Sequence, residues 1–121
     1  QKMIDWVKKI SDHAKARKSD FLIIPQNSPE LVDTPEYLAA IEGLGKESIW
    51  YESEDKIDPA ATNSAIAFID KVIAAGKFVL TIDYQVNTSK RCEFISAARL
   101  HGFVQRVVPV ALDVVEDYPT C

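Results

Sequence analysis

Five residues with chemically useful side chains stand at or near the ends of short apolar runs in this sequence. They are Gln26, Asn27, Glu47, Asp83 and Tyr84. In parallel α/β folds, the loops at the carboxyl ends of the strands line the ligand crevice. If the apolar runs are parallel strands, the five side chains are the candidates for the functional site.

Glu47 and Asp83 are the two carboxylates of this set, and they follow successive predicted strands. Adjacent strands lie about 4.8 Å apart, so the two groups could approach closely and form an acid–base pair. Like-charge repulsion would then raise the pKa of one of them. Two plainer alternatives stay open: Glu47 is a solvated loop carboxylate beside Lys46, or Asp83 caps a turn by accepting backbone N–H groups.

Helical and strand periodicity alternate along the chain, which indicates an α/β fold with parallel crossovers. The expected elements are helices over about 2–17, from Asp58 to Gly76 and from Thr88 or Ser89 to Gly102, short helical turns after Ser28, after Thr34 and around 112–115, and strands at Phe21–Pro25, Phe78–Ile82 and Phe103–Val108. The continuous apolar run 21–25 is typical of a strand buried on both faces.

Residues 41–52 are ambiguous. Ser48–Tyr51 has the better strand composition. Ile41–Glu47 contains two glycines, which weaken a strand or mark a close approach of two backbones.

The composition excludes several classes of function. The chain has 121 residues, enough for one domain, and a net charge of −4 without a basic stripe, so a nucleic-acid partner is not expected. No apolar run is long enough to span a membrane, and no signal-peptide pattern is visible. No phosphate-binding loop or metal-ligand spacing occurs, so no cofactor or metal is expected. Cys92 and Cys121 are expected to be free thiols, with a single bridge as the alternative.

Four separate blocks, in order, resemble one enzyme family. The blocks are Phe21–Asn27, Ile41–Glu47 with Trp50 and Tyr51 after it, Phe78–Tyr84, and Ala98–Val104. They are similar to the second half of a TIM-barrel glycoside hydrolase of the family typified by endo-α-1,4-polygalactosaminidases. The resemblance covers about residues 3–117 and implies a parallel (βα)4 half-barrel with strands five to eight of the family's barrel.

The resemblance also implies roles for individual residues. Strand six would run over about Ile41–Lys46, and Glu47 would be one of two catalytic carboxylates. The other belongs to an aspartate motif at the end of strand four, which this sequence lacks, so Asp83 is considered as a second carboxylate within the chain. Gln26, Asn27 and Tyr84 would hold substrate. Family relatives are often secreted; the compartment is otherwise left open.

The amides and aromatic rings near these strand ends suit a carbohydrate. Gln26 and Asn27 could bond to sugar hydroxyls, although turn formation explains Asn27 equally well. Trp50, Tyr51 and Tyr84 could stack on sugar rings, and packing in the core or rim is the alternative for each.

Half of a barrel leaves two strand edges and one apolar sheet face without partners. Three arrangements would satisfy them: a homodimer that closes an eight-stranded barrel, which we favour because one chain supplies both edges; a missing N-terminal half on another polypeptide; or an open sheet covered differently. Three functions stay open: hydrolysis of a galactosaminoglycan-type polysaccharide by the dimer, carbohydrate binding or assembly without catalysis because the strand-four aspartate is absent, and a share in a longer glycosidase.

Overall fold

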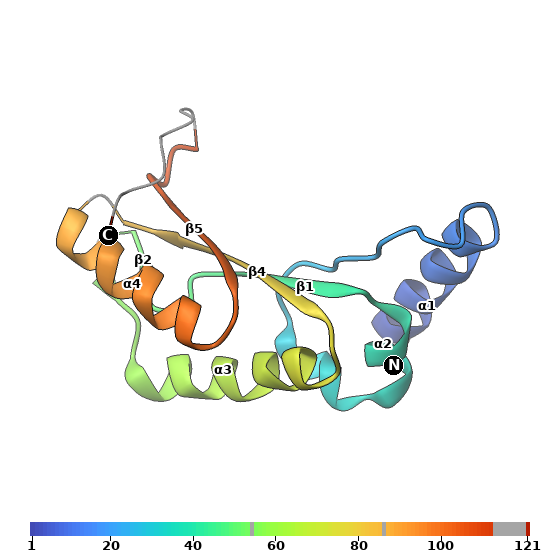
Figure 1. Ribbon diagram of the computed structural model, residues 1–121. Coiled ribbons are helices and arrows are strands. Elements are labelled where there is room, and N and C mark those ends of the chain that lie inside the picture. The colour runs from blue at the N-terminus through green and yellow to red at the C-terminus, as the bar shows by residue number, and fades with distance from the viewer. Residues whose placement is uncertain (54, 86, 113–120) are drawn as a thin grey trace.

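The computed structural model describes residues 1–53, 55–85, 87–112 and 121, and shows a parallel α/β fold (Figure 1). In chain order the elements are α1 (Lys2–Lys15), the 3-10 helix η1 (Pro29–Asp33), α2 (Pro35–Ala40), β1 (Gly43–Glu47), β2 (Tyr51–Glu52), β3 (Asp55–Lys56), α3 (Pro59–Ala74), β4 (Phe78–Tyr84), α4 (Thr88–Leu100) and β5 (Val104–Val108). The predicted α/β class is confirmed. The helical turn expected around 112–115 falls largely outside the described residues.

Three strands form one parallel sheet in the order β1–β4–β5. Crossovers through α3 and α4 connect them, as parallel strands require. The face of β4 that carries Val79, Thr81 and Asp83 is buried, and Figure 1 shows α3 and α4 below the strands. Between β1 and α3 lies the short antiparallel hairpin β2–β3, which the sequence did not predict.

The segment 21–27 runs beside β1, but it is not the doubly buried strand that its composition predicts. The Ile23 and Pro25 carbonyl oxygens accept the N–H groups of Glu42 and Gly45, at 2.9 and 2.8 Å. Pro25 has no N–H to donate, and the Ile23 N–H donates to the Glu42 carboxylate instead of a backbone carbonyl. The ladder is therefore incomplete, and the segment forms an exposed edge.

The strand in the ambiguous region is the glycine-containing one, so the composition-based choice of Ser48–Tyr51 is wrong. A side chain at Gly45 would collide with Gln26, because an added Cβ would lie 2.1 Å from the Gln26 Oε1 atom. At Gly43 an added Cβ would lie 2.5 Å from the Phe78 ring. The glycines permit these close approaches, whereas Ser48, with φ of 54°, turns the chain out of the sheet.

We expect Gly43→Ala to lower the free energy of unfolding by about 1–3 kcal/mol, the usual cost of adding a carbon atom where a neighbouring side chain must shift. The reason is that three Phe78 ring atoms lie within 2.8 Å of the new Cβ. Urea unfolding measures the change. The double variant Gly43→Ala/Phe78→Leu, which shortens the obstructing side chain, should recover part of the loss; simple additivity of the two substitutions would contradict this explanation.

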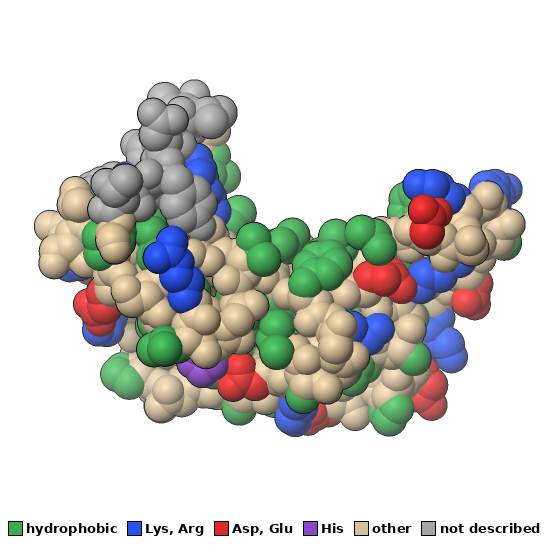
Figure 2. All heavy atoms as spheres, in the orientation of Figure 1, with side chains coloured by type: hydrophobic (Ala, Val, Ile, Leu, Met, Phe, Trp, Pro, Cys, Tyr) green, Lys and Arg blue, Asp and Glu red, His purple; other side chains and the backbone are tan. Residues whose placement is uncertain are grey.

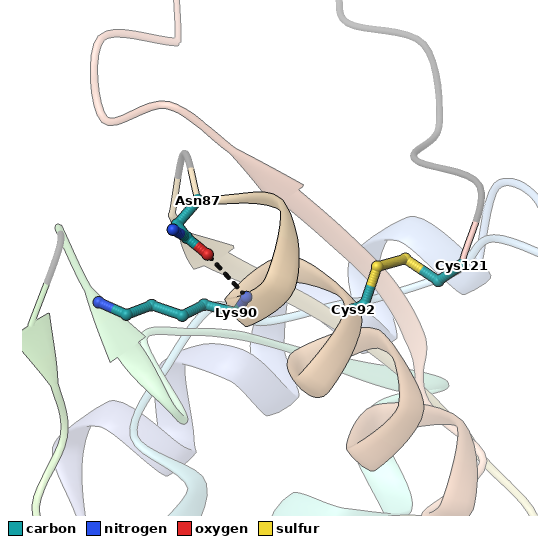
Figure 3. The surroundings of a disulfide bond; sticks show 4 residues. All are labelled: Asn87, Lys90, Cys92 and Cys121. Carbon is teal, nitrogen blue, oxygen red and sulfur yellow. Dashed lines mark hydrogen bonds between the residues drawn. A yellow bond between two sulfur atoms is a disulfide. The ribbon is translucent and has the colours of Figure 1, made fainter.

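A disulfide joins Cys92, on α4, to Cys121 at the end of the chain (Figure 3). The expectation of two free thiols was therefore wrong, because a separation of 29 residues in sequence reveals nothing about proximity in space. Asn87, and not Thr88 or Ser89, is the N-cap of α4: its side-chain oxygen accepts the Lys90 N–H at 3.1 Å (Figure 3).

The face of the sheet opposite α3 and α4 exposes apolar side chains. Leu80 pairs with Val104 across β4 and β5, and Leu22 and Ile24 share the alternation of Gln26, which bridges to Gly45. Their exposed fractions are 38% for Leu80, 61% for Val104, 54% for Leu22 and 39% for Ile24. Figure 2 shows hydrophobic side chains along this hollowed surface. We call this surface the open sheet face.

None of the helices in the described part of the chain is long and apolar enough to cross a membrane.

Candidate functional site

The carboxylate of Glu47, at the carboxyl end of β1, is held on both oxygens. The Asn27 amide donates to Oε1 at 2.7 Å, and the Tyr84 hydroxyl donates to Oε2 at 2.6 Å. The Glu47 N–H in turn donates to the Asn27 Oδ1 atom at 3.2 Å. Three predicted site residues therefore form one hydrogen-bonded cluster.

Strand register explains why these residues meet. Glu47 pairs with Ile82 on β4, and Tyr84 lies two residues further along, so that both side chains point to the same face. Asn27 comes from the edge segment, where a φ of 62° turns the chain at the end of the ladder. Gln26 lies beside Gly45 and also interacts with the Glu47 carboxylate.

The hydrogen bonds fix the protonation states of the cluster. The Tyr84 hydroxyl, followed by the Asn27 amide, lowers the pKa of Glu47 below its ordinary value. The same contact, together with burial, raises the pKa of Tyr84 to about 12. At neutral pH, Glu47 is thus an anion and Tyr84 a neutral donor.

An open pocket of about 540 Å³ lies over this cluster. Its lining residues are Asn27, Lys46, Glu47, Ser48, Glu52, Ile57 and Tyr84. Lys46, Ser48, Glu52 and Ile57 were not predicted. The first two adjoin Glu47 in sequence, which is a usable signal, but Glu52 and Ile57 reach the pocket only because of the unpredicted hairpin.

Lys46 gives the pocket a cationic group. Its ammonium donates to the Glu47 backbone carbonyl. Burial lowers the pKa of Lys46, while Asp83 and then Glu47 oppose that effect. The charged residues that line the pocket are thus Lys46, Glu47 and Glu52.

Asp83 lies at the same end of the sheet but does not face the pocket. It is fully buried, and adjacent residues of a strand point to opposite faces, so that Tyr84 faces Glu47 and Asp83 does not. Both of its oxygens accept backbone N–H groups, from residues 49–51. The expected pairing of the Glu47 and Asp83 carboxylates is therefore wrong. The alternative, in which Asp83 accepts backbone N–H groups, is what the structure shows.

Trp50 and Tyr51, candidates for stacking on sugar, do not line the pocket; both follow the alternative of packing within the protein. The Trp50 ring packs edge-on against Phe94, with ring centroids 5.4 Å apart. Tyr51 is buried, and its hydroxyl donates to Glu93 at 2.9 Å. The turn at Ser48 directs both rings toward α4 and the core.

We expect Tyr84→Phe to raise the pKa of Glu47, because the substitution removes the contact that lowers it most. A lowered carboxylate pKa adds stability at pH values above the ordinary 4.5, and this contribution is lost as the pH falls through the folded-state value. The variant should therefore lose less stability on acidification. Carboxyl NMR titration of Glu47 measures the shift. Tyr51→Phe is the matched control, since its hydroxyl binds Glu93; an equal effect of both variants would contradict the assignment.

In residues 1–53, 55–85, 87–112 and 121, no group of three or more His, Cys, Asp or Glu side chains could hold a metal ion. A hollow of about 330 Å³ between α1 and α2 is lined by Lys8, Ser11, Asp12, Lys15, Glu36, Ala39 and Ala40, none of them a predicted site residue.

Fold and site together define a parallel α/β protein with a hydrogen-bonded carboxylate in an open pocket at the carboxyl edge of its sheet. No known family profile matches the chain. Three proteins described as uncharacterized are similar to it. The protein from Deinococcus radiodurans is 33% identical over 112 residues, which are 92% of this chain and 36% of the relative. The Thermotoga maritima protein is 31% identical over 98 residues, 79% of this chain and 30% of the relative. The Methanocaldococcus jannaschii protein is 28% identical over 110 residues, which are 88% of this chain and 31% of the relative. The chain spans about a third of the length of these relatives.

Proposed function

We propose that the chain is half of a glycoside hydrolase-like barrel, in which Glu47 acts on a galactosaminoglycan-type polysaccharide. The observation that carries the proposal is the Glu47 carboxylate, held by Asn27 and Tyr84 inside an open pocket. The resemblance of Phe21–Asn27 and Ile41–Glu47 to the polygalactosaminidase family supports it.

The protonation state of Glu47 narrows its role. Glycosidases use one protonated carboxyl group as acid and one ionised carboxylate as nucleophile or base. Because its pKa is lowered, Glu47 suits the second role. Asp83 is not placed to be the acid, since it points to the other face of the sheet, and Glu52, which also lines the pocket, or a carboxyl group of a complementary half would take that role. The carboxylates of Glu47 and Glu52 suit a polysaccharide that carries amino groups.

The open sheet face supports completion of the barrel by further strands. A long apolar surface between two strand edges is normally covered in a folded protein. The relatives are about three times as long as this chain, so most of each lies outside the matched segment. We therefore place a complementary half from a longer polypeptide ahead of the homodimer favoured by sequence. Light scattering at micromolar concentration separates the two: a stable dimer supports self-completion, and a monomer excludes it.

The direct test is release of reducing ends from polygalactosamine by this chain, alone and with the complementary half of a relative supplied in trans. We expect cleavage of the amino polysaccharide in preference to an uncharged glucan. The proposal would be overturned if neither the chain alone nor the chain with the complementary half cleaved either polysaccharide.

A second candidate function is carbohydrate binding without catalysis. The position of Asp83, outside the pocket, favours it, because the chain then lacks the expected partner carboxylate. Calorimetric binding of galactosamine oligosaccharides without any cleavage, in both preparations, would establish this alternative.

A further inference from the structure

The carboxylate of Asp83 binds three consecutive backbone N–H groups. Its Oδ1 atom accepts the Ile49 N–H at 2.6 Å, and its Oδ2 atom accepts those of Trp50 and Tyr51 at 2.9 and 3.3 Å. The side chain has no exposed surface. One buried anion on β4 thus anchors the segment 49–51 that follows β1.

This anchored segment is continuous with the wall of the Glu47 pocket. Ser48 precedes it and Glu52 follows it, and both line the pocket. The Ser48 N–H donates to the Ile82 carbonyl oxygen at 2.9 Å. Residues 49–51 thus connect the two wall residues: Ser48 is also held on β4 by its own hydrogen bond to Ile82, and Glu52 follows the anchored segment directly.

Hydrogen bonds between uncharged groups also connect residues 49–51 to other parts of the protein. The Thr62 hydroxyl, on α3, donates to the Ile49 carbonyl at 2.7 Å. The Ile57 N–H donates to the Trp50 carbonyl at 2.8 Å. These contacts are insensitive to pH, whereas the contacts to Asp83 depend on an ionised carboxylate.

We propose that Asp83 is a proton-sensitive positioning residue, whose carboxylate fixes residues 49–51 and whose protonation loosens the wall of the Glu47 pocket. The reason is chemical. An ionised carboxylate only accepts hydrogen bonds, whereas a protonated one presents an O–H donor on one oxygen. That donor would face the N–H groups of the segment and displace at least one of them.

The surroundings of Asp83 place this change in an accessible pH range. Burial raises the pKa of Asp83 to about 6, and the three N–H groups, followed by Lys46 on β1, partly oppose the rise. Among the described residues, Tyr51 on β2 and Tyr84 on β4 also sense its charge. Its strand neighbour on β5 is the apolar Val107.

The sign of the linkage gives a distinctive signature. A raised carboxyl pKa means that the folded state binds the proton more tightly than the unfolded state. The contribution of Asp83 to stability is then complete below about pH 4 and is lost as the pH rises through about 6. The hydrogen bonds from residues 49–51 to Asp83 have the opposite pH dependence. They are strongest above pH 6, where the carboxylate is ionised.

The test is an NMR titration of the wild-type chain between pH 4 and 8. We expect the amide resonances of Ile49, Trp50 and Tyr51 to move together, with the midpoint of the Asp83 carboxyl carbon, and those of Ser48 and Glu52 to follow. In Asp83→Asn these shared transitions should disappear. The control Thr81→Val lies on the same buried face of β4, where its hydroxyl has no partner in the structure, and should keep them.

Tryptophan fluorescence gives a second readout. The chain has two tryptophans, so in a Trp6→Phe background the signal comes from Trp50 alone. Because the centroid of the His101 ring lies 6.5 Å from that of the Trp50 ring, the measurement is repeated with His101→Gln. Persistence of the transition in this variant supports the proposal, and its loss overturns the fluorescence assignment to Asp83.

Three results would overturn the proposal: amides 49–51 that do not change with pH, a carboxyl midpoint different from theirs, or a transition that survives Asp83→Asn. Fixed resonances of Ser48 and Glu52 would refute the link to the pocket. If Asp83→Asn does not fold, the coincidence of wild-type midpoints still decides. The test needs no carbohydrate, so its failure is distinct from failure of the proposed hydrolysis.

Discussion

On the proposed function, Glu47→Gln is expected to lower the rate of glycosidic cleavage by about 10²–10⁴-fold, the usual contribution of one positioned catalytic acid or base. The glutamine amide keeps the size of the side chain and can still accept the Tyr84 hydroxyl. It cannot attack the anomeric carbon or take a proton from water. The loss should therefore appear in kcat, with oligosaccharide affinity changed much less.

The measurement compares reducing-end release by wild type and variant in the same assembly, either the chain alone or the chain with a complementary half. Glu36→Gln, on α2 away from the pocket, makes the same change in charge and should keep the wild-type rate. Equal rates for wild type and Glu47→Gln would remove Glu47 from catalysis.

Reduction of the disulfide is expected to lower the free energy of unfolding by roughly 2–4 kcal/mol. The bond between Cys92 and Cys121 closes a loop with a sequence separation of 29 residues. Cross-linking a loop of this size restricts the unfolded chain more than the folded one. It also ties the end of the chain to α4, the helix that packs on Trp50 through Phe94.

Urea unfolding with and without dithiothreitol measures this effect. The double variant Cys92→Ser/Cys121→Ser should match the reduced wild type and should not respond to the reductant. A wild-type chain whose midpoint is unchanged by reduction would contradict the expected stabilisation. A reductant-sensitive double variant would trace the effect to something other than this bond.

Sequence reasoning succeeded where short-range patterns govern structure. The amphipathic pattern of residues 2–17 matches α1, and the start at Asp58–Pro59 matches α3, whose N-cap side chain accepts the Ala60 and Ala61 N–H groups. Propensity failed at Ser48–Tyr51, which has strand composition but turns away from the sheet. There, tertiary contacts of Gly43 and Gly45 outweighed local preference.

The candidate site was predictable in part. Asn27, Glu47 and Tyr84 each end an extended segment, and parallel pairing brings the ends of such segments to the same edge of the sheet. Asp83 was misplaced because the exact last residue of a strand decides which face a side chain takes, and a shift of one residue reverses it. Glu52 was missed because its hairpin carries no clear turn signal.

By itself, the amino-acid sequence determined the alternation of helices and strands, the parallel direction of the sheet and the set of polar residues at its carboxyl edge. These properties depend on hydrophobic periodicity and on glycine and proline, which act over a few residues. Only the tertiary structure decided which carboxylate faces the pocket, which one anchors the segment 49–51, and that Cys92 reaches Cys121. These features depend on strand register and on contacts between residues distant in sequence, and neither can be predicted from patterns that extend over only a few residues.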